Sequence, residues 1–196
     1  KSHRTDCGSD EARAETECAG EAVAEALKML LSHNTSKLVV TRPVVEAGES
    51  LGYLPGDLEQ KLNPYLRPFY DAMESLVPRE TVRRLVESGA VETAPLAYMR
   101  GRTLEASVVI LDEAQNTTRE QMKMFLTRMG ENAKVFVTGD ITQIDLPRRT
   151  ESGLVHALGL LKSIPEIGTM KLTADDVIRA QLVKKIVKAY EDEERQ

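Results

Sequence analysis

Two adjacent carboxylates, Asp112 and Glu113, directly follow a short apolar run in the middle of the sequence. The run covers residues 107–111 and suits a strand buried on both faces, as in a parallel sheet covered by helices. Ligands of α/β proteins bind at the carboxyl ends of such strands. Two acids at that place repel one another and are poorly solvated unless a cation or a reacting water uses them. We therefore expect Asp112 to reach a nucleotide-bound Mg²⁺ and Glu113 to orient or deprotonate the attacking water.

A second strand pattern ends in a loop that carries Gln143. Residues 134–138 form a short strand-like run, which Gly139 interrupts. From this glycine on, the sequence matches the Gly-Asp-x-x-Gln loop of superfamily 1 and 2 helicases. There the loop follows the Walker B strand, and its glutamine senses the γ-phosphate. The two strand ends, separated by one helix, resemble half of an ATPase site. For the adjacent carboxylates the alternative is an acidic cap at the start of a helix.

Composition limits the classes of protein to which the chain can belong. Its 196 residues, 41% hydrophobic and 29% charged, are typical of one globular domain. No stretch approaches the roughly 18 apolar residues that cross a bilayer, and no signal peptide is visible. Cys7 and Cys18 lack metal-ligand spacing, so we expect free thiols in a reducing cytoplasm. The net charge of −5 argues against a protein coated in nucleic acid, although it leaves room for a local basic groove.

The elements that must position these strand ends alternate between helix and strand. Residues 1–20 are polar and aperiodic and predict an irregular amino end, whereas residues 21–196 form the expected core domain. Helices are expected from 21 to about 32, over 80–88, 117–129 and 153–162, and from 175 onward; strands are expected over 37–41, 90–96, 107–111, 134–138 and 168–173. This order predicts an α/β fold with a largely parallel sheet.

Residues 44–78 carry repeated prolines and glycines between short apolar stretches. Because proline lacks a backbone donor and glycine permits turns, we expect an ordered loop with short helices around 58–62 and 68–76. An insertion of this length inside a compact domain is usually functional or flexible.

Basic side chains occur at two places that suit nucleic acid. Arg42 ends the strand expected over 37–41, where its position suits a phosphate contact. Tyr98, Arg100 and Arg102 surround a glycine and combine stacking on a base with contacts to phosphate. The alternatives are a solvated strand end and an exposed turn.

Long collinear segments of the sequence match one family. They lie between about Ala22 and Glu191 and comprise Thr41–Gly52, Leu54–Leu58, Pro64–Pro68, Ala94–Leu104, Ile110–Thr118, Met122–Arg128, Val137–Pro147 and Asp176–Arg179. On these segments the chain resembles the PhoH family of phosphate-starvation-inducible P-loop ATPases, relatives of the superfamily 1 helicase core. The resemblance implies a RecA-like P-loop NTPase core with helices on both faces of the sheet. It also implies ATP and Mg²⁺ as ligands, a cytoplasmic location, ring-like homo-oligomers and a role in RNA metabolism.

The resemblance also assigns roles to two residues beyond the carboxylates. Gln143 would contact the γ-phosphate, and Arg179 would act as an arginine finger within or between subunits. Arg179 lies in the first turn of the expected last helix, where a cation opposes the helix dipole. The following Ala180 departs from the family, which usually has histidine there.

The phosphate-binding loop is the main departure from the family pattern. Family members carry Gly-x-x-x-x-Gly-Lys-Thr or Ser before the first helix, because backbone amides cradle the phosphates and lysine neutralises them. No complete copy occurs in this sequence. An ungapped comparison puts Ser9–Thr16 in its place, with Glu15 at the lysine position and Thr16 at its end. Alternatively, Lys1 and Ser2 are the end of the motif, followed by an insertion over residues 3–19.

Two functions remain open at this point. The first is a PhoH-like domain that binds and hydrolyses ATP with Mg²⁺ and is coupled to RNA metabolism. The second is a non-catalytic domain that binds RNA or a protein partner through Arg42, Tyr98, Arg100 and Arg102. The glutamate at the lysine position favours the second function, whereas the adjacent carboxylates and the glutamine loop favour the first.

Overall fold

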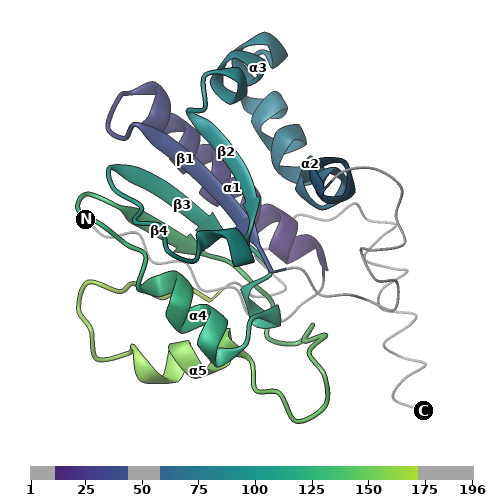
Figure 1. Ribbon diagram of the computed structural model, residues 1–196, viewed down its shortest axis with the longest axis vertical. Helices are drawn as coiled ribbons and strands as arrows, with labels where there is room; N and C mark the ends of the chain where they lie inside the picture. Colours follow the sequence, from purple (N-terminus) through teal and green to yellow (C-terminus); the bar gives the residue numbers. More distant parts are fainter. Residues whose placement is uncertain (1–11, 44–57, 172–196) are drawn as a thin grey trace.

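A computed structural model describes residues 12–43 and 58–171, and within helical residues 12–18 and 58–66 it describes the backbone alone. Figure 1 shows a parallel sheet with helices on both sides. Within the described residues the sheet has four strands, in the order β2-β1-β3-β4. Their bounds are β1 Lys37–Arg42, β2 Val91–Pro95, β3 Ser107–Leu111 and β4 Lys134–Val137. This arrangement confirms the expected α/β fold with a parallel sheet.

Strand β3 lies in the middle of the sheet and is buried along its whole length. Its side chains alternate between two hydrophobic clusters. Val108 and Ile110 belong to the first cluster, and Val109 and Leu111 belong to the second. Burial of each such side chain stabilises the fold by roughly 1.5–3 kcal/mol. The strand that leads to the carboxylates is therefore fixed from both faces.

The two clusters are closed by different helices, as Figure 1 shows. The first cluster takes side chains from α1 (Ala12–Leu31), α2 (Leu58–Leu76) and α3 (Arg79–Glu87). The second takes them from α4 (Arg119–Leu126), α5 (Gly153–Leu160) and the short 3-10 helix η2 (Leu96–Met99). None of the helices in the described part of the chain has the length and apolarity that a membrane crossing needs.

Helix α1 begins at Ala12, well before the expected start at Glu21 and inside the segment expected to be irregular. Of the eight residues between these two positions, two alanines, two glutamates and one arginine have high helix propensity even without an apolar stripe. Propensity therefore extends the helix beyond its amphipathic part.

Helix α2 is continuous, although an ordered loop with one or two short helices was expected over 44–78, of which residues 44–57 lie outside the described residues. Pro64 and Pro68 lie inside it, which costs roughly 3 kcal/mol per interior proline. Phe69 and Met73 of the same helix are buried in the first cluster and supply compensating contacts. Tertiary packing thus overrides the local preference of proline.

The prediction of a strand over 168–173 is wrong for the residues that the structure describes. Residues 168–171 form no strand, and the last two lie outside the described residues. A short alternating run does not itself provide a neighbour with which to pair.

A charged cluster ties two strands together near their amino ends. The guanidinium of Arg102 donates to both carboxylate oxygens of Glu92, at 2.5 and 2.9 Å. The Lys37 ammonium lies 2.6 Å from the same carboxylate. The hydrogen bond from Arg102, followed by that from Lys37, lowers the pKa of Glu92 from 4.5 to about 2 against the opposing effect of burial. We call these three residues the amino-edge clamp.

The clamp predicts a stability that depends on pH. Because the pKa of Glu92 is lower in the folded state, its charge stabilises the fold above pH 4.5, and this contribution is lost as the pH falls toward 2. Glu92→Gln should lower the Tm at pH 7 by a few degrees, as loss of about 1 kcal/mol does in a domain of this size. The difference from the parent should narrow below pH 4.5 in thermal unfolding followed by circular dichroism. Glu25→Gln, which removes an exposed pair with Lys28, is the control and should leave the Tm unchanged. A constant Glu92→Gln deficit over the whole pH range contradicts the clamp.

Gly139 lies where the end of β4 approaches the 3-10 helix η3 (Ala114–Asn116). A Cβ atom at this position would lie 2.5 Å from the side-chain oxygen of Gln115 and 3.1 Å from the backbone nitrogen of Ala114. The close approach of these two segments therefore requires a glycine.

Gly139→Ala should lower the free energy of unfolding by about 1–3 kcal/mol, because the alanine overpacks a closed site. Gly159→Ala is the matched control, since a Cβ atom there meets nothing within 4 Å. In helix α5 the control substitution should stabilise the fold by up to about 1 kcal/mol. Urea unfolding measures the free energy of unfolding of both variants. The same change in both variants would contradict the close approach at Gly139.

Candidate functional site

Three residues meet in one row across the carboxyl edge of the sheet. The register pairs Thr41 with Leu111 and Leu111 with Val137, so the next residue of each strand falls into the following row. That row holds Arg42, the last residue of β1, together with Asp112 after β3 and Thr138 after β4. Backbone hydrogen bonds from Asp112 to Thr41 and from Thr138 to Leu111, at 3.0 and 2.9 Å, hold the row together.

Asp112 is the buried carboxylate of this row, with 7% of its surface exposed. The hydroxyl of Thr138 donates to its Oδ1 at 2.6 Å, and Nε of Arg42 lies 3.8 Å from its Oδ2. Burial raises the pKa of Asp112, and the threonine and the arginine partly offset this effect. A charged carboxylate held in this position is a favourable place for a cation.

Glu113 adopts a left-handed backbone conformation, with φ 52° and ψ 35°. This conformation costs a residue with a side chain roughly 1–3 kcal/mol, and such strain is concentrated at functional sites. The Nη2 of Arg42 forms an ion pair with Oε1 of Glu113, and the amide of Gln115 donates to its Oε2 at 2.8 Å. The strained turn thus presents a carboxylate held at both oxygens.

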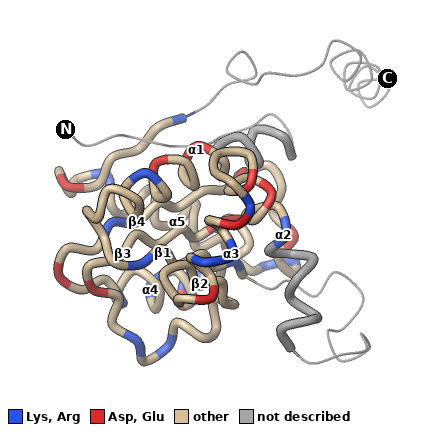
Figure 2. Tube along the Cα trace, turned by 90° about the horizontal axis from the view of Figure 1, so that it is seen from above, with Lys and Arg blue, Asp and Glu red and all other residues tan. Residues whose placement is uncertain are grey.

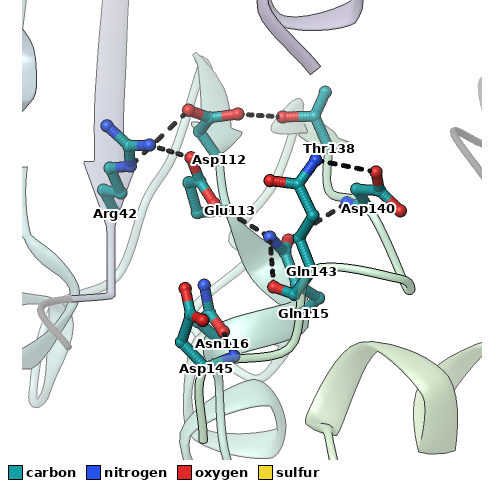
Figure 3. Close-up of polar contacts among 9 residues, drawn as sticks. All are labelled: Arg42, Asp112, Glu113, Gln115, Asn116, Thr138, Asp140, Gln143 and Asp145. Carbon is teal, nitrogen blue, oxygen red and sulfur yellow. Dashed lines mark hydrogen bonds and ion pairs between the residues drawn. The ribbon is translucent and has the colours of Figure 1, made fainter. Parts of the chain in front are cut away.

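The loop after β4 packs against this turn. Asp140, which is buried, accepts hydrogen bonds from the backbone and the hydroxyl of Thr142, both at 2.7 Å. Its other oxygen accepts from Nε2 of Gln143 at 3.0 Å. Further along, the backbone of Asp145 donates to Oδ1 of Asn116 at 2.8 Å. Figure 3 shows the side chains of both strand ends in one polar cluster.

The structure therefore brings together four residues that the sequence proposed for function, namely Arg42, Asp112, Glu113 and Gln143. Arg42 was expected to contact nucleic acid, but its guanidinium lies against the two acids of this site instead. Lys1, Ser2 and Arg179 lie outside the described residues. Thr16 lies within helix α1, and its side chain is not described.

One of the other three basic or aromatic candidates, Arg102, lies away from this site. Arg102 belongs to the amino-edge clamp, which includes Lys37, the first residue of β1. Arg42 is the last residue of the same strand. A strand of this length separates its two ends by about 16 Å. Tyr98 is 53% exposed and Arg100 is exposed.

A hollow of about 340 Å³ adjoins Arg100 on the flank formed by η2 and α4. It is also lined by Leu96, Ala97, Glu120, Gln121 and Met124. Figure 2 shows basic and acidic residues interspersed along the described part of the chain. The hollow beside Tyr98 has both Arg100 and Glu120 in its lining, so it carries charges of both signs.

Three residues of the site had no assigned role in the sequence interpretation. Gln115 and Thr138 contact the carboxylates, and Asp140 holds the glutamine loop. Asp140 is the aspartate of the matched Gly-Asp-x-x-Gln loop, and Gln115 and Thr138 stand within two residues of a recognised motif position, so membership in or proximity to a motif was the signal that could have found them. Among the residues described, no three His, Cys, Asp or Glu side chains gather as a metal site. Mg²⁺ is commonly held by only one or two carboxylates together with substrate phosphates.

Comparison with known proteins agrees with these motifs. The family model for PhoH-like proteins matches residues 19–191. The chain is 54% identical over 170 residues to the PhoH-like protein of Bacillus subtilis, which covers 87% of this chain and 53% of the relative. It is 53% identical over 169 residues to the PhoH-like protein of Mycobacterium tuberculosis, and the match covers 86% of this chain and 48% of the relative. The protein PhoH of Escherichia coli is 47% identical over 171 residues, again covering 86% and 48%. The chain spans about half the length of these relatives, and it belongs to the PhoH family.

Proposed function

We propose that this chain forms the ATP-hydrolysing core of a PhoH-like protein and that it works with Mg²⁺. The observation that carries the proposal is that the buried Asp112 of the row is followed directly by the strained Glu113. The Gln143 loop packs against both through a shared hydrogen-bond network. A structural cap would need neither a desolvated carboxylate nor a left-handed glutamate.

The environment of Asp112 fits the binding of Mg²⁺. Carboxylate oxygens suit this hard cation, and the hydroxyl of Thr138 fixes the orientation of the carboxylate. The raised pKa of Asp112 reflects a buried charge that a cation would compensate. When bound, Mg²⁺ supplies neutralisation of the phosphate charge that develops during hydrolysis. Asp112 is therefore the residue proposed to hold it.

Glu113 is proposed to orient the attacking water. Its carboxylate is held by Arg42 at one oxygen and by Gln115 at the other, so it is confined to one orientation. Gln143 follows on the adjacent strand end and is the proposed contact to the γ-phosphate. Arg179 remains the proposed arginine finger, and Lys1, Ser2 and Thr16 remain proposed contacts to the nucleotide.

The proposal extends beyond this chain, since the matched segments cover only 53% and 48% of these two relatives. We include in it a coupling of ATP hydrolysis to RNA metabolism, a ring-like homo-oligomer and a cytoplasmic location.

The hydrolytic role of Glu113 is tested in a form of the protein that carries a complete Gly-x-x-x-x-Gly-Lys-Thr loop ahead of α1, which we call the loop-complete form. Glu113→Gln should leave Mg·ATP binding unchanged and lower turnover about 100-fold or more, because a general base contributes at least that much. Phosphate release measures turnover, and calorimetry measures binding. Glu105→Gln is the control, since Glu105 is exposed and lies before β3 at the opposite edge of the sheet. Turnover that survives Glu113→Gln within a factor of about three contradicts the assigned role.

Contact with single-stranded RNA is a second candidate function, supported by the exposure of Tyr98 and Arg100 beside the hollow. A half-exposed tyrosine can stack on a base, and the neighbouring arginine can contact phosphate. Arg102 is removed from this set because Glu92 holds both arms of its guanidinium. This surface would also serve a non-catalytic member of the family.

For this surface, Tyr98→Ala should weaken binding of single-stranded RNA by about 1–3 kcal/mol with little change in salt dependence, since stacking is uncharged. Arg100→Ala should lower the slope of log affinity against log salt by about one unit, because one phosphate contact is lost. Arg102→Ala is the matched arginine control and should lower the Tm while leaving that slope unchanged. Fluorescence anisotropy at several salt concentrations measures all three variants. RNA binding that depends on Arg102 but not on Tyr98 or Arg100 would place the contact elsewhere.

A further inference from the structure

A buried carboxamide joins the two polar strand ends of the site. Gln115 belongs to the 3-10 helix η3 that follows β3, and its side chain is fully buried, at 0% exposure. Its Nε2 donates to Oε2 of Glu113 at 2.8 Å and to the backbone oxygen of Gln143 at 3.3 Å. Its Oε1 accepts from the backbone nitrogen of Asp140 at 3.2 Å. One planar group therefore contacts the carboxylate after β3 and two backbone positions of the loop after β4 (Figure 3).

The packing around Gln115 leaves this group little freedom. Its oxygen lies so close to Gly139 that a Cβ atom there would approach it to 2.5 Å. The backbone segments after β3 and β4 are also fixed to each other, because the backbone N–H of Ala114 donates to the backbone carbonyl oxygen of Thr138 at 2.9 Å. A buried amide loses free energy when its donors or acceptor are left without partners, so its hydrogen bonds resist rearrangement.

We propose that Gln115 is a positioning residue that couples the placement of the Gln143 loop to the orientation of the Glu113 carboxylate. This inference rests on the proposed function, in which Gln143 meets the terminal phosphate and Glu113 orients the water. Arg42 holds one oxygen of Glu113, and Gln115 holds the other. A displacement of the loop backbone on contact with the phosphate is transmitted through the rigid carboxamide to that second oxygen. Glu113 thereby takes its working orientation when the loop is seated.

Two substitutions separate the hydrogen-bonding role of Gln115 from its volume. Gln115→Glu keeps the size and an oxygen that can accept from Asp140, but it loses both donated hydrogen bonds. Gln115→Asn keeps the amide chemistry but is one methylene too short to reach both strand ends. In the loop-complete form, each should lower kcat about 10-fold to 100-fold, as removal of a partner behind a site residue commonly does. The Kd for Mg²⁺ with a non-hydrolysable ATP analogue should stay within about threefold, because Gln115 is not a proposed ligand of the nucleotide.

A double-mutant cycle tests the coupling itself. If Gln115 acts through the loop, the kcat of Gln115→Asn combined with Gln143→Ala should lie within about twofold of the kcat of Gln143→Ala alone. Multiplication of the two single effects would overturn the coupling, because independent contributions multiply.

Thr118→Ala is the stability control. It removes the capping box that starts helix α4, where Thr118 accepts from the backbone of Gln121, and it leaves the contacts of Gln115 intact. This variant should lower the Tm and preserve kcat. An equal loss of kcat in Thr118→Ala, or Gln115 variants that hydrolyse ATP like the parent, would overturn the inference and leave the proposed function standing. A loop-complete parent that hydrolyses no ATP would overturn both.

Discussion

Desolvation of the Asp112 carboxylate is the constraint to which the rest of the site responds. The strand that carries it is covered on both faces, so the carboxylate emerges in a place with little access to water. An uncompensated charge in such a place costs several kcal/mol. Compensation comes from the residues in the same row on the two flanking segments, the arginine that ends β1 and the threonine after β4. The parallel register that aligns these strand ends therefore builds the site.

The same register explains why the backbone at Glu113 can be strained. A left-handed glutamate persists only where its surroundings determine it more strongly than its own preference. Here Arg42 and Gln115 hold the side chain, and η3 fixes the following backbone against the end of β4. The hydrophobic clusters on both faces of the sheet supply the stability that offsets this strain.

Much of the fold follows from the sequence because it depends on local patterns. The apolar run before Asp112 predicts a doubly buried strand, and the run before Gly139 predicts its neighbour. The helix limits were harder, since the proline-bearing α2 is held by tertiary packing of Phe69 and Met73.

The partners of individual side chains could not be read from the sequence, because they depend on how strands align with one another. Arg42 and Arg102 look alike as isolated basic residues near apolar runs. Register places the first beside the carboxylates, whereas Glu92, which also pairs with Lys37, binds the second at the other edge. Gln115 escaped notice for the same reason, since its contacts join segments far apart in the chain. A single strand pattern specifies which residues are buried but not which neighbours they meet.

The central claim is that the buried carboxylate after β3 holds the Mg²⁺ of a bound nucleotide. Calorimetric titration of ATP into the loop-complete form, with and without Mg²⁺, tests this claim most directly when it is repeated on Asp112→Asn. The account predicts that Mg²⁺ strengthens ATP binding to the parent about tenfold or more. The substitution should remove most of this gain, because asparagine keeps the contact to Thr138 but loses the negative charge. A dependence on Mg²⁺ that is unchanged in Asp112→Asn would contradict it.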